Sequence, residues 1–179
     1  MAEFLWIFWS FSLLGWVLER LFAAVTRSPR RRRRCLLLLP LCPVYGLGMA
    51  AVLALPPSLR SGWPLYLWGG LTATSVEYIY HWWGETFLGV SFWDYTGVFG
   101  NFRGRVCLPF SLAWGLLLFP AVYLVTPPVV ALADRVPVGV TWWLLLAFTA
   151  DAVCSLRFLA VTHDLEALRA VIWPVSGDR

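Results

Sequence analysis

The sequence predicts an all-α, polytopic membrane protein with about five transmembrane helices. Of its 179 residues, 60% are hydrophobic and only 13% are charged, whereas a soluble domain carries about 25% charged residues. Five apolar runs are each long enough to cross roughly 30 Å of hydrocarbon as an α-helix. Because no long polar segment separates these runs, residues 1–162 are expected to form a single transmembrane domain.

The first three apolar runs lie at about residues 4–25, 35–55 and 63–83. The first run follows Met-Ala-Glu instead of a basic segment, which favours an uncleaved helix over a signal peptide. The second run contains Pro40 and Pro43. Proline lacks a backbone donor and clashes with the preceding turn, so a kinked or interrupted helix is expected there.

The last two apolar runs lie at about residues 106–125 and 138–161. Before them, residues 84–105 mix aromatic and charged side chains, and they are too polar to cross a bilayer and too aromatic for a free loop. We expect an interfacial or re-entrant segment there, and the sequence does not choose between the two. Residues 163–179 are expected to form a cytoplasmic tail.

The basic residues predict an orientation. All fourteen are arginines, and five crossings divide them unequally. Twelve fall on one side, namely Arg20, Arg27, Arg30 to Arg34, Arg103, Arg105, Arg157, Arg169 and Arg179, and two, Arg60 and Arg135, fall on the other. The positive-inside rule then predicts a multi-pass protein of the cell (inner) membrane, with the N-terminus outside and the C-terminus cytoplasmic. The arginine run between two spans is interpreted as a topology anchor, so no nucleic acid partner is expected.

The absence of lysine excludes several mechanisms. A Walker A loop, a pyridoxal Schiff base and a Ser-x-x-Lys nucleophile pair all need a lysine. Any ATP hydrolysis would therefore depend on a separate ATPase subunit. No catalytic residue and no cofactor are predicted, and whether the protein is an enzyme stays open. The four cysteines fall in the cytoplasmic half of the expected topology, where disulfides are rare, so none is expected.

Three acidic residues lie inside the apolar runs. Glu19, Glu77 and Asp151 each cost roughly 2.5–3.5 kcal/mol to insert at a helix centre, and counting along the helices puts all three in the central or cytoplasmic half. Together with Tyr45 they are our candidates for a substrate or ion pathway. Alternatively, Glu19 pairs with an arginine or a tyrosine hydroxyl and only locks helix packing. Glu77, His81 and Glu85 share one helix face, but with no second histidine in a span no metal site is expected.

A second group of candidates lies in the segment at residues 84–105. It consists of Glu85, Trp93, Asp94, Tyr95, Asn101, Arg103 and Arg105. Arginine binds phosphate bidentately and aromatic rings fix the depth of a segment in the bilayer, so this group could bind a lipid headgroup. In the alternative interpretation, Asp94 pairs with Arg103 or Arg105 inside a folded loop.

Several local motifs resemble those of a family of small bacterial multi-pass membrane proteins, the type IV ABC-transporter permeases. They are Gly15-Trp16 with Glu19, Cys42-Pro43-Val44-Tyr45-Gly46, Glu77-Tyr78 with Glu85, Trp93-Asp94-Tyr95, Asn101 with Gly104 to Leu108, and Trp114-Gly115. The resemblance covers about residues 4–120, and it does not reach Asp151. The approach to the second motif, Cys35 to Pro40, and the residue Phe92 depart from the family pattern.

The resemblance implies a permease-like transport subunit without an ATPase of its own, with an unknown substrate. Two alternatives remain open at this stage. One is a membrane-embedded protein that binds or modifies lipid headgroups, and the other is a non-catalytic scaffold assembled through small residues such as Gly46, Gly48, Gly69 and Gly70. The partners expected are the lipid bilayer, a separate ATPase subunit and further copies of the chain.

Overall fold

The computed structural model describes residues 2–26 and 35–170. The predicted all-α class is confirmed, because the structure is 76% helical with almost no sheet. The arginine run with Arg27, and the end of the predicted tail with Arg179, lie outside the described residues.

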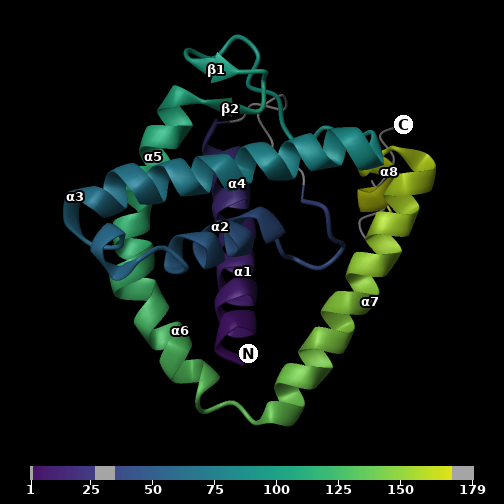
Figure 1. The fold of residues 1–179 in the computed structure, drawn as a ribbon. Helices are drawn as coiled ribbons and strands as arrows, with labels where there is room; N and C mark the ends of the chain where they lie inside the picture. Colours follow the sequence, from purple (N-terminus) through teal and green to yellow (C-terminus); the bar gives the residue numbers. More distant parts are fainter. Residues whose placement is uncertain (1, 27–34, 171–179) are drawn as a thin grey trace.

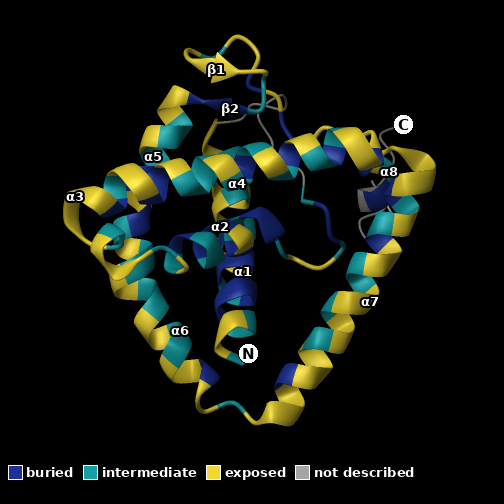
Figure 2. Ribbon diagram, viewed as in Figure 1, coloured by how far each residue is buried: buried dark blue, intermediate teal, exposed yellow. Residues whose placement is uncertain are grey.

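Within residues 2–26 and 35–170, three helices are long and apolar enough to cross a membrane by length and composition. They are α1 (Ala2–Thr26), the continuous helix Leu108–Ala133 and α7 (Val138–Thr162). Figure 1 shows α1 and α7 running toward the same end of the molecule, while the helix between them runs the opposite way. Much of the side-chain surface of α7 is exposed (Figure 2), as expected for a helix whose neighbour is lipid.

The helix Leu108–Ala133 continues past residue 125, where the fourth apolar run was expected to end, and through Pro127 and Pro128. It comprises α5 (Leu108–Pro120), the π-helical turn η5 (Ala121–Val125) and α6 (Thr126–Ala133). Pro127 and Pro128 have no backbone N–H, and the wider π turn before them tolerates the loss of the two hydrogen bonds that other residues would donate. The Thr126 hydroxyl also donates to the Ala121 carbonyl at 2.8 Å, which satisfies an acceptor in this turn.

The second apolar run does not form one long helix. Residues 36–40 are a series of bends, and only α2 (Pro43–Leu53) is helical, with Pro43 in its first turn. At 1.5 Å per residue, its 11 residues reach about 16 Å, which is too short to cross a bilayer. The expected interruption at the prolines is confirmed, whereas the expected count of five spans is not.

The third apolar run is part of a longer helical rod. This rod comprises α3 (Gly62–Pro64), the π-helical turn η3 (Leu65–Gly69), α4 (Gly70–Trp83) and a second π-helical turn, η4 (Gly84–Leu88). A short 3-10 turn, η2 (Pro57–Leu59), precedes it. Figure 1 shows the rod crossing the direction of the three long helices, and it is not among the helices suited to span a membrane.

The segment between the rod and α5 folds over one end of the helices. Its two strands, β1 (Asn101–Phe102) and β2 (Val106–Cys107), pair antiparallel. The turn between them contains Arg103 and Gly104, both at positive φ. Val90, Phe92, Trp93 and Tyr95 from this segment join a buried cluster with Leu159 of α7 and two residues of α8 (Leu165–Ala170). The aromatic residues of the segment therefore form part of the core.

Two cysteines are joined, so the expectation of no disulfide is wrong. Cys35 and Cys42 form a disulfide, with their Cα atoms 5.1 Å apart, within the usual range for a disulfide. The bends at residues 36–40 reverse the chain and bring together two residues that a helix would have kept apart. Cys107 is a buried thiol and Cys154 an exposed one.

Close helix packing depends on small residues, as the scaffold interpretation suggested. A Cβ atom added at Gly46 would collide with the Phe8 carbonyl oxygen and the Ser12 hydroxyl of α1, and one added at Gly70 would press on Gly115 of α5. Gly48 differs, since a Cβ there meets no atom within 4 Å.

Gly46 and Gly48 provide a matched test of this packing. We expect Gly46→Ala to lower the free energy of unfolding by about 1–3 kcal/mol, the usual cost of overpacking. Gly48→Ala should leave it unchanged or raise it, because alanine favours a helix over glycine. Thermal unfolding in mild detergent, followed by tryptophan fluorescence, measures both values. Equal losses for the two variants would contradict the packing described.

The disulfide predicts how many thiols the cell-derived protein presents. After acid trapping and denaturation, a maleimide reagent should modify two of the four cysteines. Reduction before labelling should raise that number to four. A Cys35→Ser variant, which frees Cys42, should show three thiols without reduction. Four modified thiols in the unreduced wild-type protein would show that the pair is not joined.

Candidate functional site

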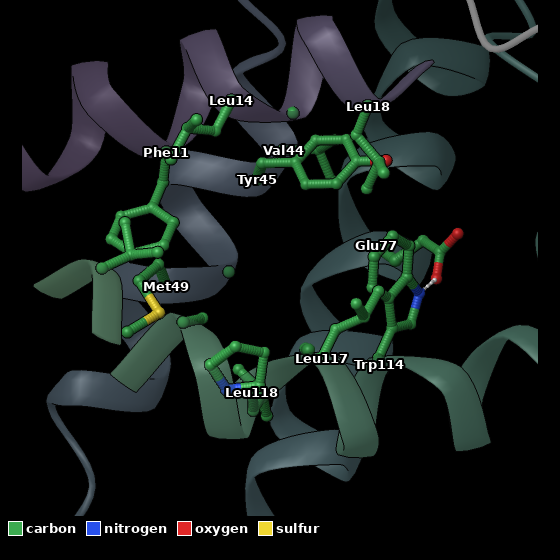
Figure 3. A pocket seen from close by; sticks show the side chains of 16 residues that line it. Phe11, Leu14, Leu18, Val44, Tyr45, Met49, Glu77, Trp114, Leu117 and Leu118 are labelled. Atoms are coloured by element: carbon green, nitrogen blue, oxygen red, sulfur yellow. Dashed lines mark hydrogen bonds between the residues drawn. The ribbon is translucent and has the colours of Figure 1, made fainter. Parts of the chain in front are cut away.

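A cavity of about 280 Å³ lies between α1, α2, α4 and the α5–η5 helix. Figure 3 shows α1 along one side and α5 along the opposite side, with side chains of α2 between them. Its walls are mostly hydrocarbon, and its polar side chains are Tyr45, Glu77 and Trp114. Its volume is near the lower end of the range for small-molecule sites.

Helical periodicity explains how α1 and α5 line this cavity. Phe11, Leu14 and Leu18 recur at intervals of three and four residues along α1 and therefore share one face. Trp114 and Leu118 are spaced in the same way along α5. From α2, Val44, Tyr45, Gly48 and Met49 complete the wall.

Tyr45 joins α2 to α1 at one end of the cavity. Its ring lies so close over Gly15 that a Cβ atom at that position would overlap it. Its hydroxyl donates a hydrogen bond to Oε1 of Glu19. The tyrosine hydroxyl that was considered as the partner of Glu19 is therefore that of Tyr45. The pair joins the two helices, and Tyr45 lines the cavity.

Glu77 of α4 lies at the same end and is only 3% exposed. Its Oε2 accepts a hydrogen bond of 2.7 Å from Nε1 of Trp114, and its Oε1 accepts one of 3.2 Å from the Tyr95 hydroxyl. The Trp114 ring also meets the Tyr45 ring edge to face, with centroids 5.4 Å apart. The contact between the two rings thus connects the hydrogen bond of Glu19 to those of Glu77.

Asp151 does not line this cavity. Its two carboxylate oxygens accept hydrogen bonds from the backbone amides of Leu38 and Leu39, at 3.1 and 3.0 Å. The Ser155 hydroxyl donates to it as well, at 3.0 Å. Asp151 therefore satisfies amides of the bent segment that the second apolar run forms. Of the three predicted acids, Glu77 lines the cavity and Glu19 binds the lining residue Tyr45.

The second group of candidates forms a separate cluster around Arg105. Its guanidinium donates to Oε2 of Glu85 from Nε, and Nη2 lies 2.7 Å from the same oxygen. Nη1 donates to the Tyr78 hydroxyl at 2.8 Å. His81 lies beside this cluster, with Nδ1 3.4 Å from Glu85 and Nε2 donating to the Trp93 carbonyl at 2.7 Å.

These contacts differ from the interpretation in which Asp94 pairs with an arginine inside a folded loop. Arg105 pairs with Glu85 and not with Asp94. Asp94 caps a turn instead, accepting from the Thr96 amide at 2.8 Å. Hydrogen bonds from the Thr96 hydroxyl and amide lower the pKa of Asp94 below its usual value. The Trp93 indole donates to the Arg105 carbonyl at 2.7 Å and ties this turn to the hairpin.

The remaining candidates occupy the hairpin. The side-chain oxygen of Asn101 accepts from the Gly104 amide at 3.3 Å, and its nitrogen donates to the Val98 carbonyl at 3.0 Å. Arg103 is exposed at the turn, with its guanidinium over the Phe102 ring. Within residues 2–26 and 35–170, no three His, Cys, Asp or Glu residues are grouped so that they could hold a metal ion.

Sequence reasoning missed two residues that organise these clusters. Trp114 lines the cavity and binds Glu77, and Tyr78 binds Arg105. Both are part of motifs that carried the family resemblance, yet neither was assigned a role. The helical interval from Trp114 to Leu118 was the available signal, because it puts the indole on a continuous apolar face.

Comparison with known proteins identifies one family. A model described as "Putative ABC-transporter type IV" matches residues 6–156, which is most of the chain. No curated protein and no solved structure matches.

The pairing of Arg105 with Glu85 can be tested by a double-mutant cycle. We expect Glu85→Gln and Arg105→Gln each to lower the unfolding temperature, and the double variant to unfold close to the less stable single variant, because both remove the same interaction. Arg103→Gln is the control and should have little effect, since its side chain is exposed. Additive losses from Glu85→Gln and Arg105→Gln would show that the two side chains act independently.

Proposed function

The chain belongs to the putative ABC-transporter type IV family, and on this premise we propose that it is a membrane-embedded, permease-like subunit of an ABC-type transport system. The observation that carries the proposal is the cavity between α1, α2, α4 and α5, where hydrocarbon walls end at Glu77 and Tyr45. Apolar pockets with a few polar groups at defined points are typical of small-molecule sites. The cavity is the proposed substrate site of this subunit.

A separate ATPase subunit is the proposed partner. The sequence contains no lysine, so the chain cannot form a Walker A loop, in which a lysine reaches the phosphates of the nucleotide. Energy from ATP would then come from another polypeptide that contacts this one. The β1–β2 hairpin, with its exposed Arg103, is the proposed contact surface.

The proposed orientation puts the hairpin in the cytoplasm of the cell, with the protein in its inner membrane. Three crossings, like five, leave the termini on opposite sides. The hairpin lies at the end of the molecule where α1 and α7 finish, and the turn between α6 and α7 lies at the end where α1 begins (Figure 1). Arg103, Arg105 and Arg157 belong to the first end and Arg135 to the second, which supports the positive-inside assignment.

An assembly of several subunits also follows from the proposal. Three helices suited to span a membrane are few for a complete translocation pathway. Further copies of the chain, or other membrane subunits, would supply the rest of the pathway.

Purification from native membranes in mild detergent tests the subunit role. We expect the wild-type chain to copurify with a nucleotide-binding protein and the eluate to hydrolyse ATP. Arg103→Glu should reduce this copurification because it reverses a charge at the proposed contact. Arg135→Glu is the matched control, an exposed arginine at the opposite end, and should retain the partner.

Three results would overturn parts of the proposal. A wild-type chain that copurifies with no ATPase removes the subunit role. If the chain instead copurifies with a lipid-modifying enzyme or only with itself, that result favours the lipid or the scaffold interpretation. Loss of the ATPase in Arg135→Glu but not in Arg103→Glu would reverse the proposed orientation.

A further inference from the structure

The lining of the cavity extends along two helices suited to span a membrane. On α1 its lining extends from Phe11 to Leu18, about 10 Å at 1.5 Å per residue. On the opposite side it extends from Trp114 to Val125, about 16 Å. A cavity of about 280 Å³ with this length is shaped for a chain rather than for a compact solute.

The polar groups of the cavity lie at one end of this length. Glu77, Tyr45 and Trp114 lie near Leu18, whereas glycine, alanine, proline, phenylalanine and aliphatic side chains with Met49 line the rest (Figure 3). The oxygens at the polar end accept hydrogen bonds, as Glu77 does from Trp114 and Tyr95. This division into an apolar length and an accepting end matches an amphiphile whose head group donates hydrogen bonds.

The cavity also reaches the outer surface of the protein between α1 and α5. Leu14, Leu18 and Leu117 line it and are 45%, 39% and 43% exposed. The two helices meet beyond the polar end, where the rings of Phe22 and Phe110 lie 5.9 Å apart. At the other end α1 packs against α6. With α1 and α5 spanning the membrane as proposed, the opening between these contacts would face the hydrocarbon of the bilayer, from which an alkyl chain could enter sideways.

The charge of the lining restricts the head group. Among the described residues, Glu77 and Tyr45 are the ionisable ones that line the cavity, and none of its lining residues is an arginine or a histidine. An anionic head group would meet a carboxyl group with no basic side chain of the lining beside it, and burying such a group is costly. A hydroxyl or an ammonium group can donate to the carboxyl oxygens, and a charge-assisted hydrogen bond favours the ammonium.

We propose that this cavity binds the single alkyl chain of a membrane amphiphile, with a hydrogen-bond-donating, non-anionic head group at Glu77 and Tyr45. The inference rests on the proposed function, because it names the substrate class of the same site. The amphiphile enters between α1 and α5, and its chain lies along Leu14, Leu117 and Met49.

Binding of radiolabelled dodecylamine to the purified chain in nanodiscs tests the proposal. Dodecanol and dodecanoate, which have the same chain length, serve as competitors. We expect unlabelled dodecylamine to compete about tenfold or more better than dodecanoate, the scale of one charge-assisted hydrogen bond. Dodecanol should fall between them. Glu77→Gln should weaken dodecylamine about tenfold and leave dodecanol nearly unchanged.

Gly48→Leu locates the bound chain. Gly48 lines the cavity, and a Cβ atom there meets no atom within 4 Å, so the larger side chain fills the cavity without disturbing α2. Saturable dodecylamine binding should be lost in this variant. Gly139→Leu is the matched control, since Gly139 of α7 also has no atom within 4 Å of an added Cβ and does not line the cavity. Its binding should equal that of the wild type.

The outcomes separate this inference from the transport role. Equal competition by dodecanoate and dodecylamine overturns the head-group class, and binding that survives in Gly48→Leu overturns the site. Absence of saturable binding while an ATPase copurifies overturns the ligand and leaves the subunit role intact. Saturable binding without a copurifying ATPase would support the proposed ligand class and overturn the proposed subunit role.

Discussion

The buried carboxyl group of Glu77 is the interaction on which the rest of the site depends. It accepts hydrogen bonds from Trp114 of α5 and from Tyr95 of the segment before the hairpin, so one side chain of α4 holds three parts of the chain together. The contact between the Trp114 and Tyr45 rings extends this network to α2, and the hydrogen bond from Tyr45 to Glu19 extends it to α1. The same side chains that fix the helices also form the polar end of the cavity.

The shortness of α2 is the second constraint, and it follows from proline. Pro40 and Pro43 prevent a continuous helix through the second apolar run, so α2 reaches only partway along α1. The bent residues before it expose backbone amides, and Asp151 of α7 satisfies those of Leu38 and Leu39. An acid that is costly in a membrane helix is retained here because it pairs with backbone that no helix or strand satisfies.

Most charged residues of the segment at residues 84–105 form hydrogen bonds or an ion pair within the protein, and these interactions stabilise the fold of the segment. Arg105 is bound by Glu85 and Tyr78, and Asp94 caps a turn at Thr96. Arg103 remains exposed at the tip of the hairpin. The part of this surface that the cluster leaves exposed, the tip of the hairpin, is therefore the part available for the proposed contact with a partner.

The sequence by itself determined the helical membrane class, the break at Pro40 and Pro43, and the acids inside the apolar runs, since composition, proline chemistry and the cost of buried charge are local properties. It also carried the motifs of the family. Only the tertiary structure decided that Glu77 lines the cavity, that Glu19 binds the lining residue Tyr45 while Asp151 lies elsewhere, that Arg105 pairs with Glu85, and that Cys35 meets Cys42. Those outcomes depend on how bends and helix crossings bring distant residues together, which spacing along one chain does not specify.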